Sequence, residues 1–282
     1  MNDWFEESLH PNLRQRLSIN RVVFQENTDH QKVIIFENDL LGRVLAIDGV
    51  VQTTEGDEFI YHEMLSHVPI LAHGDVSQVL IIGGGDGGMA REILKYKTIS
   101  NVTMVELDQS VVNICQTYLP SLSQGAFSDA RLNLIIGDGA EFVKKYEFMW
   151  DVIIIDSTDP IGPGEVLFSQ SFYTHCKRCL RSGGILVTQN GVPFVQPSSF
   201  VDSHKKLRKL FCDTSFYLAT IPTYQGGSMA FGWASENKDY RDISLSKLKN
   251  RFKVADIKTR YYTPDIHLAA FALPPEIQSL ME

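Results

Sequence analysis

Four acidic residues of the chain each follow a short apolar run of the kind that forms a buried strand. They are Asp86, Glu106, Asp138 and Asp156. In an open parallel sheet the ligand crevice lies beyond the carboxyl ends of the strands, so acids that end neighbouring strands converge on one cavity. Carboxylates there can bind ribose hydroxyls, anchor an ammonium group or accept a proton. Each acid alone could also be an ordinary helix N-cap, which is our interpretation of Asp108.

The sequence around Asp86 is typical of a nucleotide-binding turn. Residues 79–91 read VLIIGGGDGGMAR, a short apolar strand followed by glycines and by a helix expected over residues 89–96. Gly83, Gly85 and Gly88 fit the G-x-G-x-x-G spacing, which brings a ligand close to the free N–H groups of a helix N-terminus. That spacing alone is a weak signal, and a turn with nothing bound is the alternative. Glu106 strengthens it, because nucleotide-binding folds place a ribose-binding carboxylate about twenty residues further on.

Strand and helix patterns alternate regularly around these residues. Strands are expected near residues 79–82, 102–105, 132–136, 152–155 and 185–189, with helices between them and another helix near 200–211. This alternation predicts a parallel sheet with helices on both faces. Two later runs, 216–221 and 228–234, are separated by too few residues for a crossover helix and should be antiparallel. Such a closing hairpin favours the AdoMet-dependent methyltransferase architecture over the NAD-binding one.

The residues before this region have a different pattern. Short β-branched runs at 21–25, 32–37, 43–47 and 50–53 are split by Asn, Asp and Gly, which is typical of hairpins. We therefore predict an α/β protein in which residues 1–56 form a small antiparallel β domain and residues 57–282 form a Rossmann-like, doubly wound catalytic domain. The small sheet could cover the larger domain or pair with a second subunit. The last part of the chain is expected to form a strand or loop and an edge helix.

Composition excludes several classes of protein. The net charge is −8, which argues against a nucleic-acid surface and suits a cationic ligand. No apolar run approaches the length of a membrane span, and the acidic start MNDWFEESLH is unlike a secretory signal. We expect a cytoplasmic protein that contacts neither membrane nor nucleic acid.

Two patterns in the sequence contain residue types that bind metals, but neither has the full arrangement that a metal site needs. His62 and His67 lie five residues apart in an expected helix, so their side chains point about 140° away from each other. Cys176 and Cys179 form a C-x-x-C pair, but within a helical pattern and without a second pair to complete a zinc site. We expect no metal, and we interpret the four cysteines as reduced thiols.

Asp86 indicates the class of ligand. In a methyltransferase the glycine loop receives the amino acid end of AdoMet, including its carboxylate. An acid at that place repels the carboxylate, at a cost on the order of several kcal/mol, and attracts an ammonium group. Decarboxylated AdoMet, whose tail has an ammonium group and no carboxylate, fits better.

The loop that follows the fourth strand adds a second acid. Asp156 and Asp159 lie three residues apart at the expected mouth of the crevice, before a segment punctuated by Pro and Gly that could cover it. An Asx-turn followed by a solvent-exposed loop is the alternative.

Several motifs together resemble the bacterial type of the spermidine synthase family, the polyamine aminopropyltransferases. They are GGGDGGMAREILKY, MVELD, IIGDGAEFV, DVIIIDSTDPIGPGEVLF, TEGDEFIYHEML and IPTYQGG. The resemblance extends over almost the whole chain, including the N-terminal β domain and the closing RYYTPDIHLAAFALP. One departure is Gly56, where family members often carry a basic residue, and it puts nothing catalytic in doubt.

The resemblance implies a role for each matching residue. Asp156 is implied as the proton acceptor. The residues implied to bind the polyamine are Asp156, Asp159, Tyr61, His62, Asp86, Gln52 and Tyr224. Those implied to bind the nucleoside are Gln31, Gly83, Gly85, Asp86, Glu106, Asp138, Gly139 and Pro163, with Glu106 on the ribose and Asp138 and Gly139 at the adenine.

The resemblance also implies a reaction. The aminopropyl group of decarboxylated AdoMet, a co-substrate, is transferred to putrescine, which gives spermidine and methylthioadenosine without a cofactor. A homodimer or homotetramer is implied, with the N-terminal β domain as the interface. Two alternatives are an AdoMet-dependent methyltransferase acting on a small amine and a non-catalytic sensor of polyamines or nucleosides. The preferred amine stays open among putrescine, cadaverine, agmatine and spermidine.

Overall fold

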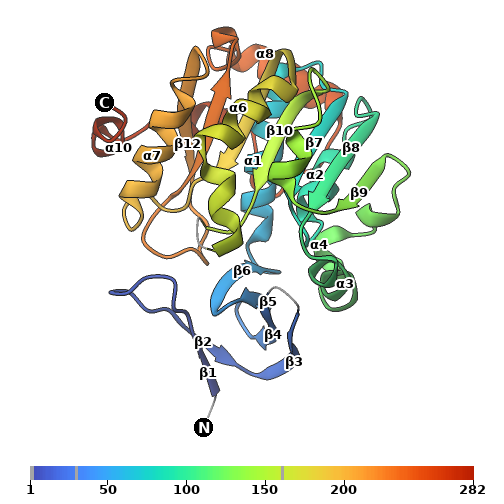
Figure 1. Ribbon diagram of the computed structural model, residues 1–282, viewed down its shortest axis with the longest axis vertical. Helices are drawn as coiled ribbons and strands as arrows, with labels where there is room; N and C mark the ends of the chain where they lie inside the picture. The colour runs from blue at the N-terminus through green and yellow to red at the C-terminus, as the bar shows by residue number, and fades with distance from the viewer. Residues whose placement is uncertain (1–2, 29–30, 160–161) are drawn as a thin grey trace.

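The computed structural model describes residues 3–28, 31–159 and 162–282, and its N-terminal part consists of two antiparallel sheets (Figure 1). The first is the hairpin of β1 (Asp3–Glu6) and β2 (Arg16–Ile19). The second has the order β3-β4-β5-β6, formed by β3 (Arg21–Asn27), β4 (Lys32–Asn38), β5 (Gly42–Ile47) and β6 (Val50–Thr54). The four runs expected from the sequence form this second sheet, whereas no sequence pattern indicates the β1–β2 hairpin.

The turn between β5 and β6 is formed by the pair Asp48 and Gly49. Both residues have positive φ, at 50° and 82°. Two central residues with positive φ give a turn whose twist matches that of the adjoining strands, and Asp-Gly is a preferred pair for it. The turn chemistry in the sequence therefore sets the register of this hairpin.

The larger part of the molecule is built on a seven-stranded sheet of order β12-β13-β11-β10-β7-β8-β9. Its strands are β7 (Gln78–Gly83), β8 (Asn101–Glu106), β9 (Leu132–Ile136), β10 (Trp150–Asp156), β11 (Leu180–Gln189), β12 (Asp213–Ala219) and β13 (Met229–Ser235). Neighbours from β11 to β9 pair in parallel, while β13 is antiparallel to both β11 and β12. The predicted α/β class, parallel sheet and closing antiparallel hairpin are confirmed.

Helices cover both faces of this sheet. They are α1 (Glu58–His73), α2 (Gly88–Leu94), α3 (Gln109–Tyr118), α4 (Pro120–Ser123), α5 (Gly139–Val143), α6 (Gln170–Cys179), α7 (Pro197–Leu207), α8 (Leu245–Ala255), α9 (Pro264–Ala270) and α10 (Pro275–Ser279). Successive strand residues point to opposite faces. Accordingly, Val152 and Ile154 pack with α1 and α2, while Ile153 and Ile155 pack with α5 and α6.

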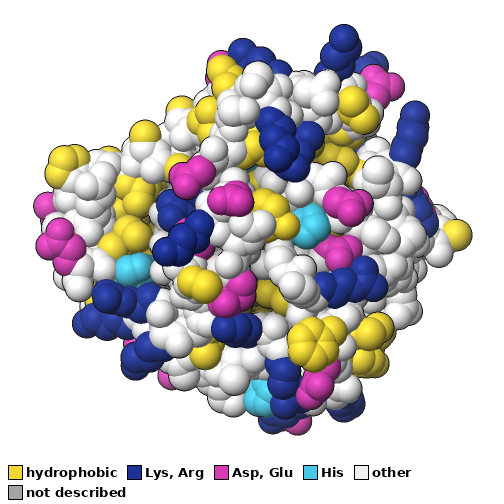
Figure 2. All heavy atoms as spheres, turned by 90° about the horizontal axis from the view of Figure 1, so that it is seen from above, with side chains coloured by type: hydrophobic (Ala, Val, Ile, Leu, Met, Phe, Trp, Pro, Cys, Tyr) yellow, Lys and Arg dark blue, Asp and Glu magenta, His cyan; other side chains and the backbone are white. Residues whose placement is uncertain are grey.

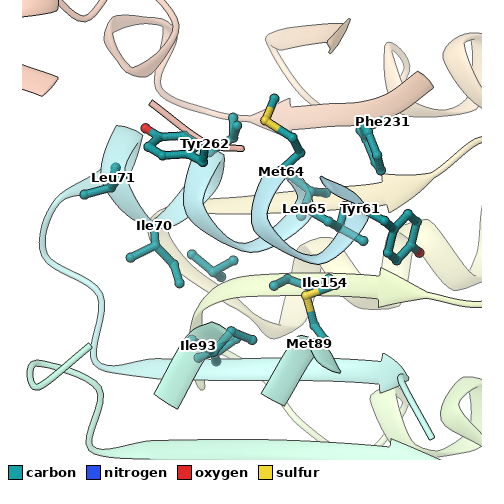
Figure 3. Packing of buried hydrophobic residues seen from close by; sticks show 14 of the residues in the cluster. Tyr61, Met64, Leu65, Ile70, Leu71, Met89, Ile93, Ile154, Phe231 and Tyr262 are labelled. Atoms are coloured by element: carbon teal, nitrogen blue, oxygen red, sulfur yellow. The ribbon is translucent and has the colours of Figure 1, made fainter. Parts of the chain in front are cut away.

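Helix α1 lies at the centre of the larger core. Nearly all of its residues are buried, as expected for a helix that is apolar on most of its circumference. Figure 3 shows Met64 and Leu65 of this helix between Phe231 on β13 and Ile154 on β10. Because the helix is enclosed, its polar side chains are held in fixed directions.

A separate apolar cluster joins the two parts of the molecule. Val33 and Ile35 on β4 and Leu45 on β5 pack against Val111 and Ile114 on α3. The small sheet is therefore fixed against the larger part by buried side chains.

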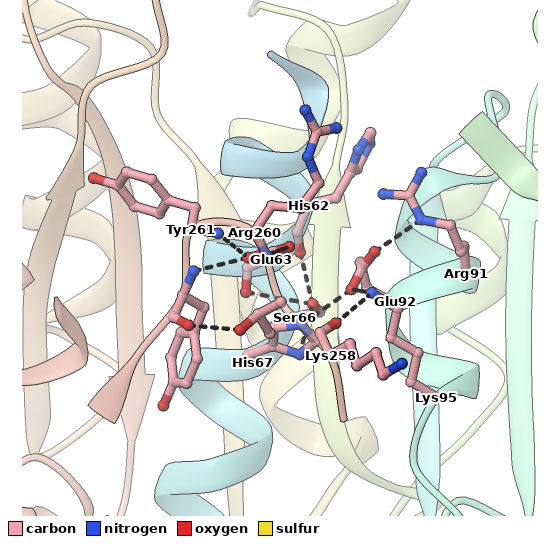
Figure 4. A network of polar contacts seen from close by, with 12 residues as sticks. His62, Glu63, Ser66, His67, Arg91, Glu92, Lys95, Lys258, Arg260 and Tyr261 are labelled. Carbon is pink, nitrogen blue, oxygen red and sulfur yellow. Dashed lines mark hydrogen bonds and ion pairs between the residues drawn. The ribbon is translucent and has the colours of Figure 1, made fainter. Parts of the chain in front are cut away.

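The C-terminal segment differs from expectation. In place of a strand or loop and an edge helix, it forms three helices, α8, α9 and α10. Helix α8 begins where the Ser244 side chain accepts a hydrogen bond from the Lys247 N–H, a standard N-cap that the sequence reading overlooked. The segment between α8 and α9 is bound to α1: the Glu63 carboxylate accepts the N–H groups of Arg260, Tyr261 and Tyr262 at 2.7–2.8 Å (Figure 4).

The surface carries charges of both signs. On the face turned upward in Figure 1, Lys and Arg side chains are interspersed with Asp and Glu (Figure 2). Within the described ranges, no helix combines the length and the apolarity that crossing a membrane requires.

We predict that Glu63→Ala lowers the free energy of unfolding by about 3 kcal/mol or more. The reason is that the change removes a buried carboxylate and leaves three backbone N–H groups without their acceptor. Urea denaturation at neutral pH measures the loss.

The control is Glu276→Ala, which changes an exposed acid of the C-terminal helix α10. Its effect should stay within about 0.5 kcal/mol, as for most surface substitutions. Equal effects of the two variants would contradict the anchoring role of Glu63.

Candidate active site

A cavity of about 680 Å³ lies between the small antiparallel sheet and the carboxyl ends of the parallel strands. The residues that line this cavity include almost every candidate site residue from the sequence analysis. These are Gln31, Gln52, Tyr61, His62, Gly83, Gly85, Asp86, Glu106, Asp138, Gly139, Asp156, Asp159 and Tyr224. The side chain of Pro163, the remaining one, lies outside the part of the chain that the structure describes.

The glycine loop and Asp156 meet at the point where the strand order reverses. Strands β7 and β10 are neighbours in the sheet although β8 and β9 lie between them in the sequence. The Gly84 N–H donates to the Asp156 carbonyl at 3.1 Å. Gly83 has φ of +89°, and a Cβ placed on it would lie 2.0 Å from the same carbonyl oxygen. Only glycine fits there, and ligands of open α/β sheets bind at this position.

Asp156 ends β10, and Tyr61 of α1 lies against it. The Tyr61 hydroxyl donates to Asp156 Oδ1 at 2.6 Å. The pKa of Asp156 is raised to about 6, because burial and the Asp86 carboxylate raise it more than His62 and the Tyr61 hydrogen bond lower it. A carboxyl group with this pKa is suited to accept a proton near neutral pH.

Asp86 is held from two sides. Its Oδ1 accepts the Gly88 N–H at 2.8 Å, and its Oδ2 lies 3.4 Å from His62 Nε2. Gly88 leaves room for the imidazole, because a Cβ there would come within 2.4 Å of the ring. The acid on the glycine loop is therefore in an ion-pair contact with a residue of α1.

Glu106 lies at the end of β8, next to the glycine loop. A Cβ on Gly85 would lie 3.1 Å from Glu106 Oε2, so the two residues are in close contact. Burial raises the pKa of Glu106 to about 7, although hydrogen bonds from the N–H groups of Asp108 and Leu107 lower it. The interpretation of Asp108 as an N-cap is confirmed, since its side chain accepts the Ser110 N–H at the start of α3.

Asp138 both lines the cavity and caps a helix. Its Oδ1 accepts the N–H groups of Ala140 and Glu141, at 2.7 and 3.3 Å, where α5 begins. The two readings of a strand-end acid, ligand-facing group and N-cap, are therefore compatible at this position.

Asp159 is bound by a residue that the sequence reading missed. Gln196 Nε2 donates to Asp159 Oδ1 at 2.9 Å, while Gln196 Oε1 accepts the Val192 N–H at 3.0 Å. Gln196 stands between a loop and α7, and no local pattern marks it. Its partner lies 37 residues away along the chain, so only the fold reveals the contact.

Tyr224 is placed by hydrogen bonds to both parts of the molecule. The neighbouring Thr223 donates its N–H and its hydroxyl to the Asp57 carboxylate before α1, at 2.7 and 2.6 Å. The Tyr224 hydroxyl donates to the Gln52 carbonyl of β6 at 2.5 Å. These bonds bring the loop between β12 and β13 over the cavity.

Two further acids near the cavity were missed by the sequence reading. Glu7 follows β1 and lines the cavity; its Oε1 accepts the Val51 N–H at 2.9 Å, and burial raises its pKa. Glu58 lies behind His62, with its Oε2 2.5 Å from His62 Nδ1. The spacing of four residues between Glu58 and His62 on one helix was a usable signal for the second contact.

The residues that we rejected as metal ligands have other environments in the structure. His67 lies 3.0 Å from both Tyr96 Oη and Glu92 Oε2, away from His62. Cys176 and Cys179 are buried free thiols on α6, and burial raises the pKa of both. In residues 3–28, 31–159 and 162–282, no three His, Cys, Asp or Glu side chains gather as a metal-binding group.

Comparison with known families gives two matches that together span most of the chain. The spermine/spermidine synthase domain matches residues 58–244, and the spermidine synthase tetramerisation domain matches residues 3–55.

Individual relatives are similar over nearly their full length. The polyamine aminopropyltransferase of Pectobacterium carotovorum is 56% identical over 279 residues, 99% of this chain and 97% of that protein. Polyamine aminopropyltransferase 1 of Pseudomonas aeruginosa is 56% identical over 270 residues, 96% of this chain and 94% of the relative. A crystal structure of spermidine synthase in complex with the transition-state analogue AdoDATO is 37% identical, with a TM-score of 0.94, and the match covers 99% of this chain and 94% of that one.

We predict that Asp156→Asn stabilises the protein at pH 8, by roughly 1–3 kcal/mol in the free energy of unfolding. The pKa of Asp156 in the folded protein, about 6, exceeds the ordinary value of 3.8 expected in the unfolded chain, so the ionised carboxylate destabilises the fold above pH 6. Well below pH 3.8 the carboxyl group is protonated in both states, and most of the difference should vanish. Urea denaturation at the two pH values measures it.

The matched control is Asp151→Asn at the other end of β10. Asp151 Oδ2 accepts the N–H groups of Ser77 and Gln78, both at 2.9 Å, so its loss of charge should destabilise the protein at pH 8. A destabilised Asp156→Asn protein at pH 8 would contradict the electrostatic argument.

Proposed function

The chain belongs to the spermine/spermidine synthase family and is a polyamine aminopropyltransferase, and from that premise we propose that it transfers the aminopropyl group of decarboxylated AdoMet to putrescine. The observation that supports this most directly is the gathering of Asp86, Asp156 and Asp159 in one cavity beside a nucleotide-type glycine loop. Both proposed substrates carry ammonium groups, which such acids attract.

The nucleoside end of the donor belongs, in this proposal, to the β7–β8–β9 side of the cavity. The Glu106 carboxylate binds the ribose hydroxyls, and Asp138 with Gly139 meets the adenine. Gln31 lines the same cavity, and the family resemblance implies Pro163 as a further nucleoside contact. The glycine loop allows close approach of the backbone, as in other nucleotide sites.

Asp86 is proposed to bind the amino group of the donor tail. Its carboxylate lies at the glycine loop, where the carboxylate of intact AdoMet would meet a like charge at a cost on the order of several kcal/mol. The tail of decarboxylated AdoMet has only an ammonium group to place there. This contrast supports the decarboxylated donor over AdoMet, and thus transfer of a propylamine over transfer of a methyl group.

Asp156 is proposed to accept a proton from the attacking amine. A primary amine with a lysine-like pKa is protonated at neutral pH, and freeing its lone pair costs roughly 4 kcal/mol. Once the proton is on Asp156, the nitrogen lone pair forms a bond to the propyl carbon next to the sulfonium. The carbon–sulfur bond breaks, its electron pair stays on sulfur, and methylthioadenosine leaves as a neutral thioether.

The far end of the acceptor needs its own anchor. Asp159, held by Gln196, is proposed to bind the second ammonium group, with Gln52, Tyr61, His62 and Tyr224 around the chain of the polyamine. Correct placement of both reactants supplies much of the remaining acceleration, because it replaces an encounter in solution by an in-line arrangement.

The β1–β6 part is proposed to join subunits into a homodimer or homotetramer. The matching family is described as a tetramerisation domain, and Trp4 and Leu40 in this part are 56% and 87% exposed in the single chain. We further propose that the protein acts in the cytoplasm and requires no metal or cofactor.

The activity is tested with purified protein, putrescine and either decarboxylated AdoMet or AdoMet. Mass spectrometry should find spermidine and methylthioadenosine in equal amounts, and only with the decarboxylated donor. A methylated amine formed from AdoMet would instead favour the small-amine methyltransferase, and no product with either donor would favour a non-catalytic sensor.

Asp86→Asn is the control for donor choice in the same assay. The amide removes the negative charge and keeps the side-chain shape, so the affinity for decarboxylated AdoMet should fall far more than that for AdoMet. Equal losses for the two nucleosides would remove Asp86 from donor discrimination.

We predict that Asp156→Asn lowers turnover by about two to four orders of magnitude, because the proton acceptor is lost. Binding of methylthioadenosine, measured by calorimetry, should change little. In the unchanged protein, kcat/KM should fall as the pH drops below about 6, where burial places the pKa of Asp156. Unaltered turnover of the variant would exclude Asp156 as the base.

A further inference from the structure

His62 has a carboxylate at each ring nitrogen. Nδ1 lies 2.5 Å from Glu58 Oε2, and Nε2 lies 3.4 Å from Asp86 Oδ2. Only 2% of the residue is exposed, so water cannot replace either partner. A neutral imidazole has one nitrogen without a proton, and that nitrogen would turn its lone pair to a carboxylate. The geometry therefore requires the doubly protonated, positively charged ring.

Glu58 is itself fixed from the other side. Arg91 of α2 donates through Nη1 and Nη2 to the two carboxylate oxygens of Glu58, at 3.0 and 2.9 Å. The Arg91 Nη1 also donates to the Leu122 carbonyl at 2.6 Å. A bidentate, buried pair of this kind holds both side chains in one orientation. Burial opposes ionisation of Glu58, yet His62 and Arg91 lower its pKa to about 2.

The result is a buried row of alternating charges that leads from α2 to the cavity. Arg91, Glu58, His62 and Asp86 follow one another, and the last reaches the proposed donor site. Burial alone would favour a neutral His62, but the carboxylates of Asp86 and Glu58 raise its pKa well above the usual value.

The charged and titratable groups that face His62 come from three elements. Glu58 and Tyr61 lie on α1, Asp86 lies on the glycine loop, and Asp156 ends β10. Asp86 and Asp156 repel each other, and this repulsion favours protonation of Asp156, whereas the imidazolium opposes it. A positive charge in a pocket for cations is thus useful, because it favours the ionised form of Asp156.

We propose that Glu58 is a positioning residue for aminopropyl transfer, which holds His62 as an imidazolium and thereby orients Asp86 and keeps Asp156 ionised at neutral pH. This rests on the roles proposed above for Asp86 and Asp156. Glu58 itself does not touch the reacting atoms; it acts through His62.

The first test needs no substrate. The imidazole carbon resonances of histidine-labelled protein are followed by NMR from pH 5 to pH 9, with His62 assigned from its absence in His62→Gln. We expect the His62 signal to keep its imidazolium shift through pH 8 in the unchanged protein. A midpoint near pH 6.5 would overturn the proposal, whatever the enzyme catalyses.

The second test compares Glu58→Gln with a matched control, Glu92→Gln. Glu92 is also buried and also binds Arg91, with its Oε1 2.8 Å from Arg91 Nε, but its other contacts run to His67 and Lys95, away from the cavity (Figure 4). Both variants lose a buried carboxylate from the same cluster, so both show the general structural cost. Only Glu58→Gln removes a partner of His62.

In Glu58→Gln we expect the acid limb of the kcat/KM profile to move up by about one pH unit, with recovery of activity at alkaline pH. The His62 midpoint should fall by about the same amount. Glu92→Gln should leave both midpoints in place. An equal loss of activity at every pH in Glu58→Gln, with the His62 midpoint unmoved, would assign Glu58 a structural role only.

Discussion

The close approach of Gly83 to the Asp156 carbonyl is the constraint on which the site depends. With 2.0 Å between a Cβ at this position and that oxygen, any side chain would push β7 away from β10. Their contact joins the glycine loop, our proposed donor site, to Asp156, the proposed proton acceptor, at the place where the strand order reverses. The remaining elements bring groups to this contact: α1 brings Tyr61, and β8 brings Glu106.

The sequence was sufficient for most of this arrangement because the relevant signals are local. Alternating apolar runs give the parallel strands, turn residues such as Asp48 and Gly49 give the small sheet, and acids at strand ends share one edge of the sheet. Gln196 and Glu7 were missed because their partners, Asp159 and Val51, are distant in the chain. The C-terminal helices were missed because the N-cap Ser244 of α8 was overlooked and because α9 and α10 are short, with 7 and 5 residues.

The cavity combines acids with two cationic side chains, His62 at its wall and Arg91 behind Glu58. Burial and the nearby carboxylate of Asp86 would by themselves favour the neutral form of Asp156. His62 and, behind it, Arg91 offset this tendency from within the protein, so that negative charge remains available to ligands. The protonation state of the acids in this pocket therefore depends also on charged residues behind the cavity wall, which extend into the core.

One turn of α1 contacts both the cavity and the C-terminal segment of the chain. Tyr61 and His62 face the cavity, while the next residue, Glu63, binds the backbone of residues 260–262, beyond the end of the matched synthase domain at residue 244. For protein engineering, the segment from 245 to 262 is thus not a dispensable appendage. Fusions, cleavage sites or shortened variants that disturb it would alter the pocket through a single helical turn, with no change in any residue that contacts a substrate.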